Sequence, residues 1–172
     1  MPFQLPAVSQ LANDFEITEI EGYEYVTPEN SISGSFRQAT EGDSLKRDDF
    51  ITVPVKTNYD SLTTTSETRK PKTLRERYAY EVYLTLTSLD LLLRDGKPLC
   101  QFRDVAGVAR VKGTFAEFKE RWGTVDTPVA MAIHNECVKA NTSWYFAIPD
   151  DDDVDATIEM DDEAEAPEGN GE

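Results

Sequence analysis

The sequence predicts an α+β protein: N-terminal β-strands or a hairpin, then a mainly α-helical domain with one long helix and a short helix pair, and a disordered acidic C-terminal tail. Apolar and acidic residues alternate early in the chain, which is typical of strands. Apolar residues recur every three or four positions in the second half, which is typical of helices. Finally, 12 of the 33 acidic residues crowd into the last part of the chain.

These patterns predict a flexible arm, one folded domain and a tail, over residues 1–13, 14–149 and 150–172. Within the domain we expect a β-rich part, a loop and a helical part, over 15–56, 57–72 and 73–149. The tail holds no basic residue, whereas the rest of the chain holds 21 acids against 17 Lys and Arg. The tail therefore carries most of the net charge of −16 and has too few apolar residues to offset its ordering entropy.

Residues 15–26 alternate apolar and acidic side chains, which predicts a strand or a hairpin broken at Glu21 and Gly22. A turn-rich connection is expected over 27–34. No run approaches the roughly 20 apolar residues that a membrane-spanning helix needs, so we expect no membrane partner.

A short helix is expected near 43–49, followed by a strand over 51–56 with Ile51, Val53 and Val55 on one face. Pro54 cannot donate to a sheet ladder, so this strand should lie at a sheet edge. The Ser- and Thr-rich residues that follow, 57–72, are expected to form a loop.

The longest predicted helix runs over residues 73–94. Thr73 and Glu76 form a T-x-x-E capping box at its start. An apolar seam follows at helical spacing and is widened by Tyr78, Tyr83 and Leu92; its residues are Ala79, Val82, Leu86, Leu89 and Leu93. The Asp-Gly-Lys-Pro turn at 95–98 should end the helix. The seam fits either the core of a monomer or a contact with a second copy.

Residues 99–112 hold two short apolar segments that fit either helix or strand. Thr114 and Glu117 repeat the capping box, and Gly123 should end the helix that they begin. Thr127 and Pro128 suit the start of a second helix, with Asn141 at its end. The expected buried faces are Phe115, Phe118 and Trp122 on the first helix, and Val129, Ala132, Ile133, Cys137 and Val138 on the second. Trp144, Tyr145 and Phe146 should fold back onto this pair.

The chain contains no phosphate-binding loop, nucleophile elbow or HExxH helix. His134 is the only histidine, and no serine or carboxylate pairing pattern surrounds it. The acids from Asp150 onward lack the central Gly and final Glu of a calcium-binding EF-hand loop. Cys100 and Cys137 lack zinc or redox spacing and predict buried free thiols. We therefore expect no enzyme, no cofactor and no metal.

Three stretches resemble tail assembly chaperones of long-tailed bacteriophages. One stretch contains Phe115, Phe118 and Trp122 followed by Gly123, then a Val-Asp-Thr-Pro turn, an Ala-Ile-His helix and the closing Asn141 and Trp144. This pattern is similar to the end of that family's folded domain. The stretch RERYAYEVYLTLTSLDLLLRDGKPL resembles the central long helix of that family with the following turn. The stretch FRQATEGD resembles short sequence motifs near the start of the family's members. The resemblance covers about residues 36–146.

The resemblance implies a chaperone in the cytoplasm of the infected host that coats the tape-measure protein and keeps its apolar helix soluble. It also implies help in recruiting tail-tube protein, and absence from the mature virion. We expect a core or partner-binding surface of aromatic and apolar side chains, formed by Phe118, Trp122, Ile133, Trp144, Val82, Leu86, Leu89 and Leu93.

Two other functions stay open. A phage single-stranded-DNA-binding protein would use the acidic tail together with a basic cluster, formed by Arg69, Lys70, Lys72, Arg75 and Arg77. The cluster also fits the solvated start of a helix, and the slightly acidic body disfavours capture of phosphates, so we expect no nucleic-acid partner. A structural head or tail completion protein of the virion shares the phage context.

Overall fold

The structure is a computed structural model that describes residues 11–51 and 73–145. Three antiparallel strands form a sheet in the order β1-β2-β3: β1 (Ala12–Ile17), β2 (Ile32–Arg37) and β3 (Leu86–Asp90). A separate antiparallel hairpin consists of β4 (Phe102–Val105) and β5 (Val108–Val111). The helices are α1 (Glu41–Ile51), α2 (Leu74–Thr85), α3 (Phe115–Trp122) and α4 (Thr127–Ala140), and a 3-10 helix follows, η2 (Thr142–Trp144). The predicted α+β class is confirmed.

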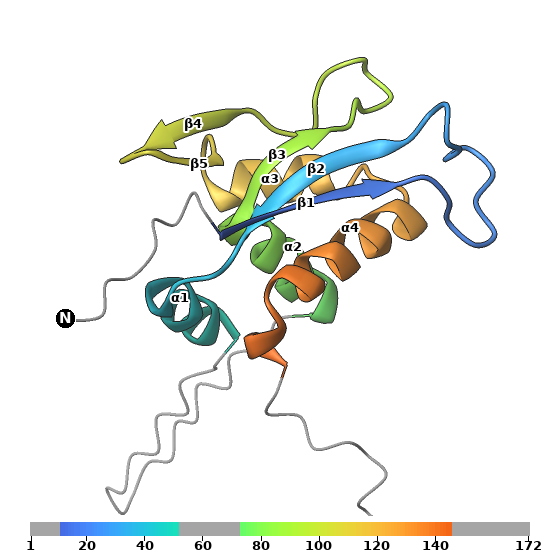
Figure 1. Cartoon of the computed structure of the whole chain (residues 1–172). Helices are drawn as coiled ribbons and strands as arrows, with labels where there is room; N and C mark the ends of the chain where they lie inside the picture. The colour runs from blue at the N-terminus through green and yellow to red at the C-terminus, as the bar shows by residue number, and fades with distance from the viewer. Residues whose placement is uncertain (1–10, 52–72, 146–172) are drawn as a thin grey trace, which may run out of the picture.

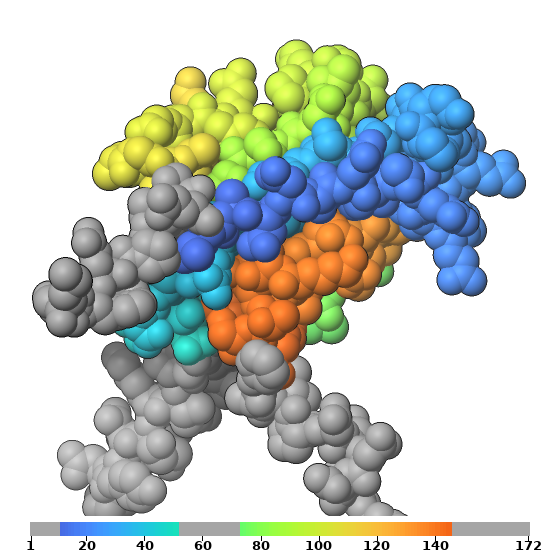
Figure 2. Space-filling view, in the orientation of Figure 1, coloured from blue at the N-terminus to red at the C-terminus, as the bar shows by residue number. Residues whose placement is uncertain are grey.

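The helices pack on one side of the sheet. α4 contacts β1 and β2, and α2 contacts both α3 and α4 (Figure 1). The β4–β5 hairpin packs on β3 and α2 at one end of the molecule, whereas the connection between β1 and β2 projects at the other end (Figure 2). The other face of the sheet carries exposed polar side chains: Asp14, Glu16, Ser33, Ser88 and Asp90. The hydrophobic core therefore lies between the sheet and the helices.

The predicted helix over 73–94 is wrong in its second half. α2 begins with the expected capping box at Thr73, but it ends at Thr85, and the chain continues directly as β3. Thr85, Thr87 and Ser88 are poor helix formers, and pairing with β2 satisfies the backbone groups of β3 instead. The described part of the chain thus contains no long helix. Gly96 of the predicted Asp-Gly turn has a positive φ angle and lies in the turn between Leu92 and Pro98, which form an isolated antiparallel bridge.

A β-bulge explains why the leucines of β3 have helical spacing. The paired residues are Phe36 with Leu86, Ser35 with Ser88, and Gly34 with Leu89. Thr87 is therefore an extra residue in β3. The extra residue brings Leu86 and Leu89 to the same face, although three positions along a regular strand lead to opposite faces. Leu92 in the following segment is 63% exposed and lies outside any buried seam.

The N-terminal predictions are partly right. β1 begins at Ala12, so the last two residues of the expected arm belong to the sheet. β2 begins at Ile32, within the range expected as a turn-rich connection. α1 confirms the short helix near 43–49, and Ile51 is its last residue instead of the start of a strand. The rest of the expected edge strand and the loop 57–72 lie outside the described residues.

Within the range 99–112, residues 102–111 form the β4–β5 hairpin, whose turn uses positive φ angles at Ala106 and Gly107. The part expected to be helical thus contains three strands. The short helix pair is confirmed as α3 and α4, with the capping box at Thr114 and with Asn141 as the C-cap. Asp126 is the N-cap of α4, so Pro128 occupies its second position. Phe146 and the tail lie outside the described residues.

Gly34→Ala is expected to lower the free energy of unfolding by roughly 1–3 kcal/mol, because the protein has no room for the added methyl group. The new Cβ would lie 2.6 Å from the Ser88 carbonyl oxygen and 2.7 Å from the Phe15 ring. Urea unfolding followed by circular dichroism measures the change.

The matched control is Gly42→Ala in the first turn of α1, where the nearest atom to the added Cβ is Thr40 Oγ1 at 3.8 Å. Because alanine favours the helix over glycine, this variant should gain up to about 1 kcal/mol. Equal effects at the two glycines would contradict the close approach of β1 and β3 to β2.

Candidate functional site

An apolar groove opens where the first turns of α2, the end of α3 and the first half of α4 meet. Its volume is about 220 Å³. The apolar side chains that line it are Tyr78, Ala79, Trp122, Val125, Ala130 and Met131. Arg75, Glu76 and Lys119 add charged groups. A concave apolar surface with a few polar groups is suited to binding a small molecule or an apolar peptide side chain.

Small residues leave the space for this groove. Ala79 of α2 and Ala130 of α4 occupy little volume, and Gly123 ends α3 without a side chain. Trp122 is held by stacking on the ring of Phe118, with 5.6 Å between ring centroids. Met131, which also lines the groove, is 38% exposed. Its flexible thioether side chain can adapt to apolar partners of different shapes.

The charged groups make the groove basic at its edge. Lys119 Nζ donates to Glu76 Oε1 at 2.9 Å and thereby joins α3 to α2. Arg75 is exposed beside this pair, and within the described residues it makes no ion pair. The edge thus has two cationic side chains against one carboxylate. Since the Lys119–Glu76 pair is itself partly exposed, it contributes about 0–1 kcal/mol to stability.

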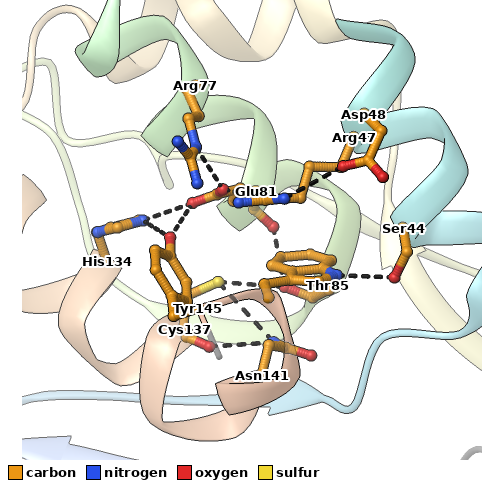
Figure 3. Close-up of polar contacts among 11 residues, drawn as sticks. Ser44, Arg47, Asp48, Arg77, Glu81, Thr85, His134, Cys137, Asn141 and Tyr145 are labelled. Carbon is orange, nitrogen blue, oxygen red and sulfur yellow. Dashed lines mark hydrogen bonds and ion pairs between the residues drawn. The ribbon is translucent and has the colours of Figure 1, made fainter. Parts of the chain in front are cut away.

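Glu81 of α2 is the centre of a buried polar network (Figure 3). Its fully buried carboxylate accepts hydrogen bonds from Arg47 Nε at 2.6 Å, Arg77 Nε at 3.0 Å and the Tyr145 hydroxyl at 2.5 Å. His134 Nε2 lies 2.8 Å from the second carboxylate oxygen. The network joins α1, α2 and α4 to the residue that follows η2.

The network keeps Glu81 ionised. Burial by itself raises the pKa of Glu81, but the hydrogen bonds from His134, Tyr145, Arg47 and Arg77 lower the pKa to about 2. A carboxylate can only accept, so His134 donates from Nε2. Burial, and then the bond to Glu81, raises the pKa of Tyr145, which keeps its hydroxyl protonated as a donor.

Tyr78 connects this network to the groove. It lines the groove, and its ring stacks on the ring of His134 with 3.9 Å between centroids. Sequence reasoning found no carboxylate partner for His134, and the structure supplies Glu81 from 53 positions away. Glu81 and His134 are both buried, so the geometry of this pair supports a role in positioning Tyr78 in the groove wall.

A second buried ion pair joins β2 to α1. Arg37 Nη1 donates to Asp43 Oδ2 at 2.5 Å, and Arg37 Nη2 donates to the Leu84 carbonyl at 2.6 Å. Burial raises the pKa of Asp43, but bonds from Arg37 and Thr40 lower the pKa to about 2. Both members of the pair lie in the FRQATEGD stretch, so this stretch helps to hold α1 on the sheet.

The structure places most of the eight expected site residues in the core. Six are buried: Phe118, Trp122, Ile133, Trp144, Val82 and Leu86. Leu89 and Leu93 are partly buried against that core. Trp122 is the member of the eight that lines the groove. Sequence reasoning did not select Met131 or Glu81. For Glu81 one signal was available, because it is a charged residue next to Val82 on the apolar side of α2.

Comparison of the chain with protein-family models, curated proteins and solved structures finds no match. In residues 11–51 and 73–145, no group of three His, Cys, Asp or Glu residues is placed to hold a metal ion. The helices described there are too short or too polar to cross a bilayer. Cys137 is buried and Cys100 partly buried; both are free thiols, and burial raises the pKa of each to about 12.

The two buried carboxylates predict a loss of stability in acid. The pKa values of Glu81 and Asp43 fall from 4.5 and 3.8 to about 2 on folding, so the unfolded chain binds protons more tightly. Their contribution is present above about pH 5 and is lost as the pH falls towards 2, with about 3 kcal/mol from Glu81. Urea unfolding at a series of pH values measures this loss.

Glu81→Gln is the companion variant. It should flatten part of the acid dependence and lower stability at neutral pH by about 3–5 kcal/mol, because Arg47 and Arg77 lose their buried counterion. Asp43→Asn should flatten a separate part of the profile. An acid profile that neither variant changes would contradict ionised carboxylates at these two positions.

Trp122→Ala should lower the free energy of unfolding by roughly 3–5 kcal/mol, because it removes a buried ring that also lines the groove. Thermal unfolding followed by circular dichroism measures the loss, and Trp122→Phe, which keeps an aromatic ring, should lose less. A Trp122→Ala protein with unchanged helical signal and melting temperature would show that the α3–α4 pair does not organise the fold.

Proposed function

We propose that this chain is a tail assembly chaperone of a long-tailed bacteriophage. In this role the groove between α2, α3 and α4 binds apolar side chains of the tape-measure protein and keeps its long helix soluble. The chaperone acts in the host cytoplasm, helps to recruit tail-tube protein and leaves before the virion is complete. The observation that carries the proposal is the solvent-accessible apolar groove, with Trp122 and Met131 in its walls.

The geometry suits a helical ligand. An amphipathic helix presents apolar side chains at intervals of three and four residues, and such side chains anchor helices in apolar grooves. The Tyr78 and Trp122 rings are both held by stacking, on His134 and Phe118, so binding orders few additional side chains in the chaperone. The adaptable Met131 suits a partner whose sequence varies along its length.

The groove and the resemblance involve the same parts of the chain. Trp122, Val125 and Thr127 come from the stretch that resembles the end of the chaperone domain. Tyr78 and Ala79 come from the stretch that resembles its central helix. Two motifs far apart in sequence thus meet at one apolar surface, and this coincidence supports a binding role that needs no catalysis and no cofactor.

The alternative of a single-stranded-DNA-binding protein receives less support. Arg77 of the basic cluster donates to the buried Glu81, so its charge is already paired. Arg75 lies at the edge of an apolar groove. The cluster members Arg69, Lys70 and Lys72 lie outside the described residues.

Met131→Asp tests the proposed function. Co-expression of the intact chain with an apolar helical fragment of the tape-measure protein should raise the soluble fraction of that fragment, and Met131→Asp should remove most of the gain by placing a charge in the groove. Soluble and insoluble fractions are quantified after affinity pull-down of the chaperone.

The matched control is Val105→Asp on the β4–β5 hairpin, because Val105 is 40% exposed and Met131 is 38% exposed. This control should solubilise the fragment as well as the unmodified chain does. A fragment that stays insoluble with the unmodified chain would overturn the chaperone proposal. Equal losses of soluble fragment in the two variants would show that the binding site lies outside the groove.

A further inference from the structure

The groove combines apolar walls with a basic edge, and this combination defines a complementary ligand. Trp122 and Met131 favour apolar side chains, whereas Arg75 and Lys119 favour carboxylates next to them. Glu76 already satisfies one donor of Lys119, so Arg75 is the stronger candidate for pairing with an incoming acid. A peptide with a few apolar residues set among acidic ones fits both features.

The chain itself contains such a peptide. Residues 150–172 hold acidic residues and no basic one, and their large apolar residues are Val154, Ile158 and Met160. Val154 and Ile158 are separated by four positions, the spacing of neighbouring anchors in groove-bound helices. Acids flank each of these apolar residues within two positions.

The described chain ends close to the groove. The ring centroid of Tyr145 lies 6.5 Å from that of His134, and His134 stacks on Tyr78 of the groove wall at 3.9 Å. Residues 146–154 can span about 30 Å when fully extended, so the tail can reach the groove of its own chain.

We infer that the acidic tail docks in the groove of its own chain, with Val154 and Ile158 as apolar anchors and Arg75 pairing with the flanking acids. A tethered ligand acts at an effective concentration in the millimolar range, so a weak contact suffices to cover the groove. A tape-measure helix with more apolar anchors then displaces the tail. The inference adds regulation to the proposed function and rests on it only for the identity of the displacing partner.

Oxidation of Met131 by hydrogen peroxide, followed by peptide mass spectrometry, tests the docking in the full chain. The chain has three methionines, and Met1 serves as the internal reference. In the variant V154S/I158S/M160S the apolar anchors are lost, and Met131 should oxidise faster than in the unmodified chain by roughly threefold or more. Arg75→Glu should also accelerate oxidation, because it repels the tail.

The matched control is A156S/T157S/A164S, which changes the same segment and keeps the anchors; its Met131 should oxidise at the unmodified rate. Equal rates in the anchor variant and the unmodified chain would overturn the inference. Protection that grows with protein concentration would also overturn it, since the occupant is then a second copy. If an added tape-measure fragment protects Met131 but the tail does not, the inference fails while the proposed function stands. If the tail protects Met131 but the added fragment does not, the inference stands while the proposed function fails.

Discussion

The buried carboxylate of Glu81 is the constraint on which the helical side of this protein depends. An ionised carboxylate without water needs partners, and the partners come from α1, α2, α4 and the residue after η2. Hydrophobic packing alone would tolerate small shifts of these helices, whereas hydrogen bonds of 2.5–3.0 Å tolerate few. The network therefore restrains the positions of α1, α2 and α4 relative to one another, and loss of one partner is costly.

The network also determines the shape of the groove. His134 is held by Glu81 and in turn stacks on Tyr78, so the position of one groove wall follows from a hydrogen bond in the core. The part of the groove wall that Trp122 forms follows from packing, because Trp122 stacks on Phe118 at the end of α3. Two walls that are fixed before binding lose little side-chain entropy when a ligand enters. The buried polar network is thus linked to the groove through the stacked rings of His134 and Tyr78.

Local signals in the sequence predicted local structure well and long-range pairing poorly. The capping boxes at Thr73 and Thr114 marked two helix starts correctly, because a cap depends on residues three positions apart. The end of α2 depends instead on β2, which supplies the partner strand, and on the bulge at Thr87, which makes strand leucines mimic a helical seam. The Glu81–His134 pair, 53 positions apart, has no local signature at all.

The chemistry of the groove limits what it can distinguish. Its polar contacts are confined to the edge, and its walls include the adaptable Met131, so it selects for apolar content and nearby negative charge more than for a defined sequence. The acidic tail has few large apolar residues, but its covalent tether gives it a high effective concentration at the groove. A long apolar helix has many apolar anchors, but it must bind from solution. Each added buried methylene favours the helix by about 0.8 kcal/mol, so a few extra anchors outweigh the tether. The groove can therefore stay covered in the free chain and still open to a more apolar partner.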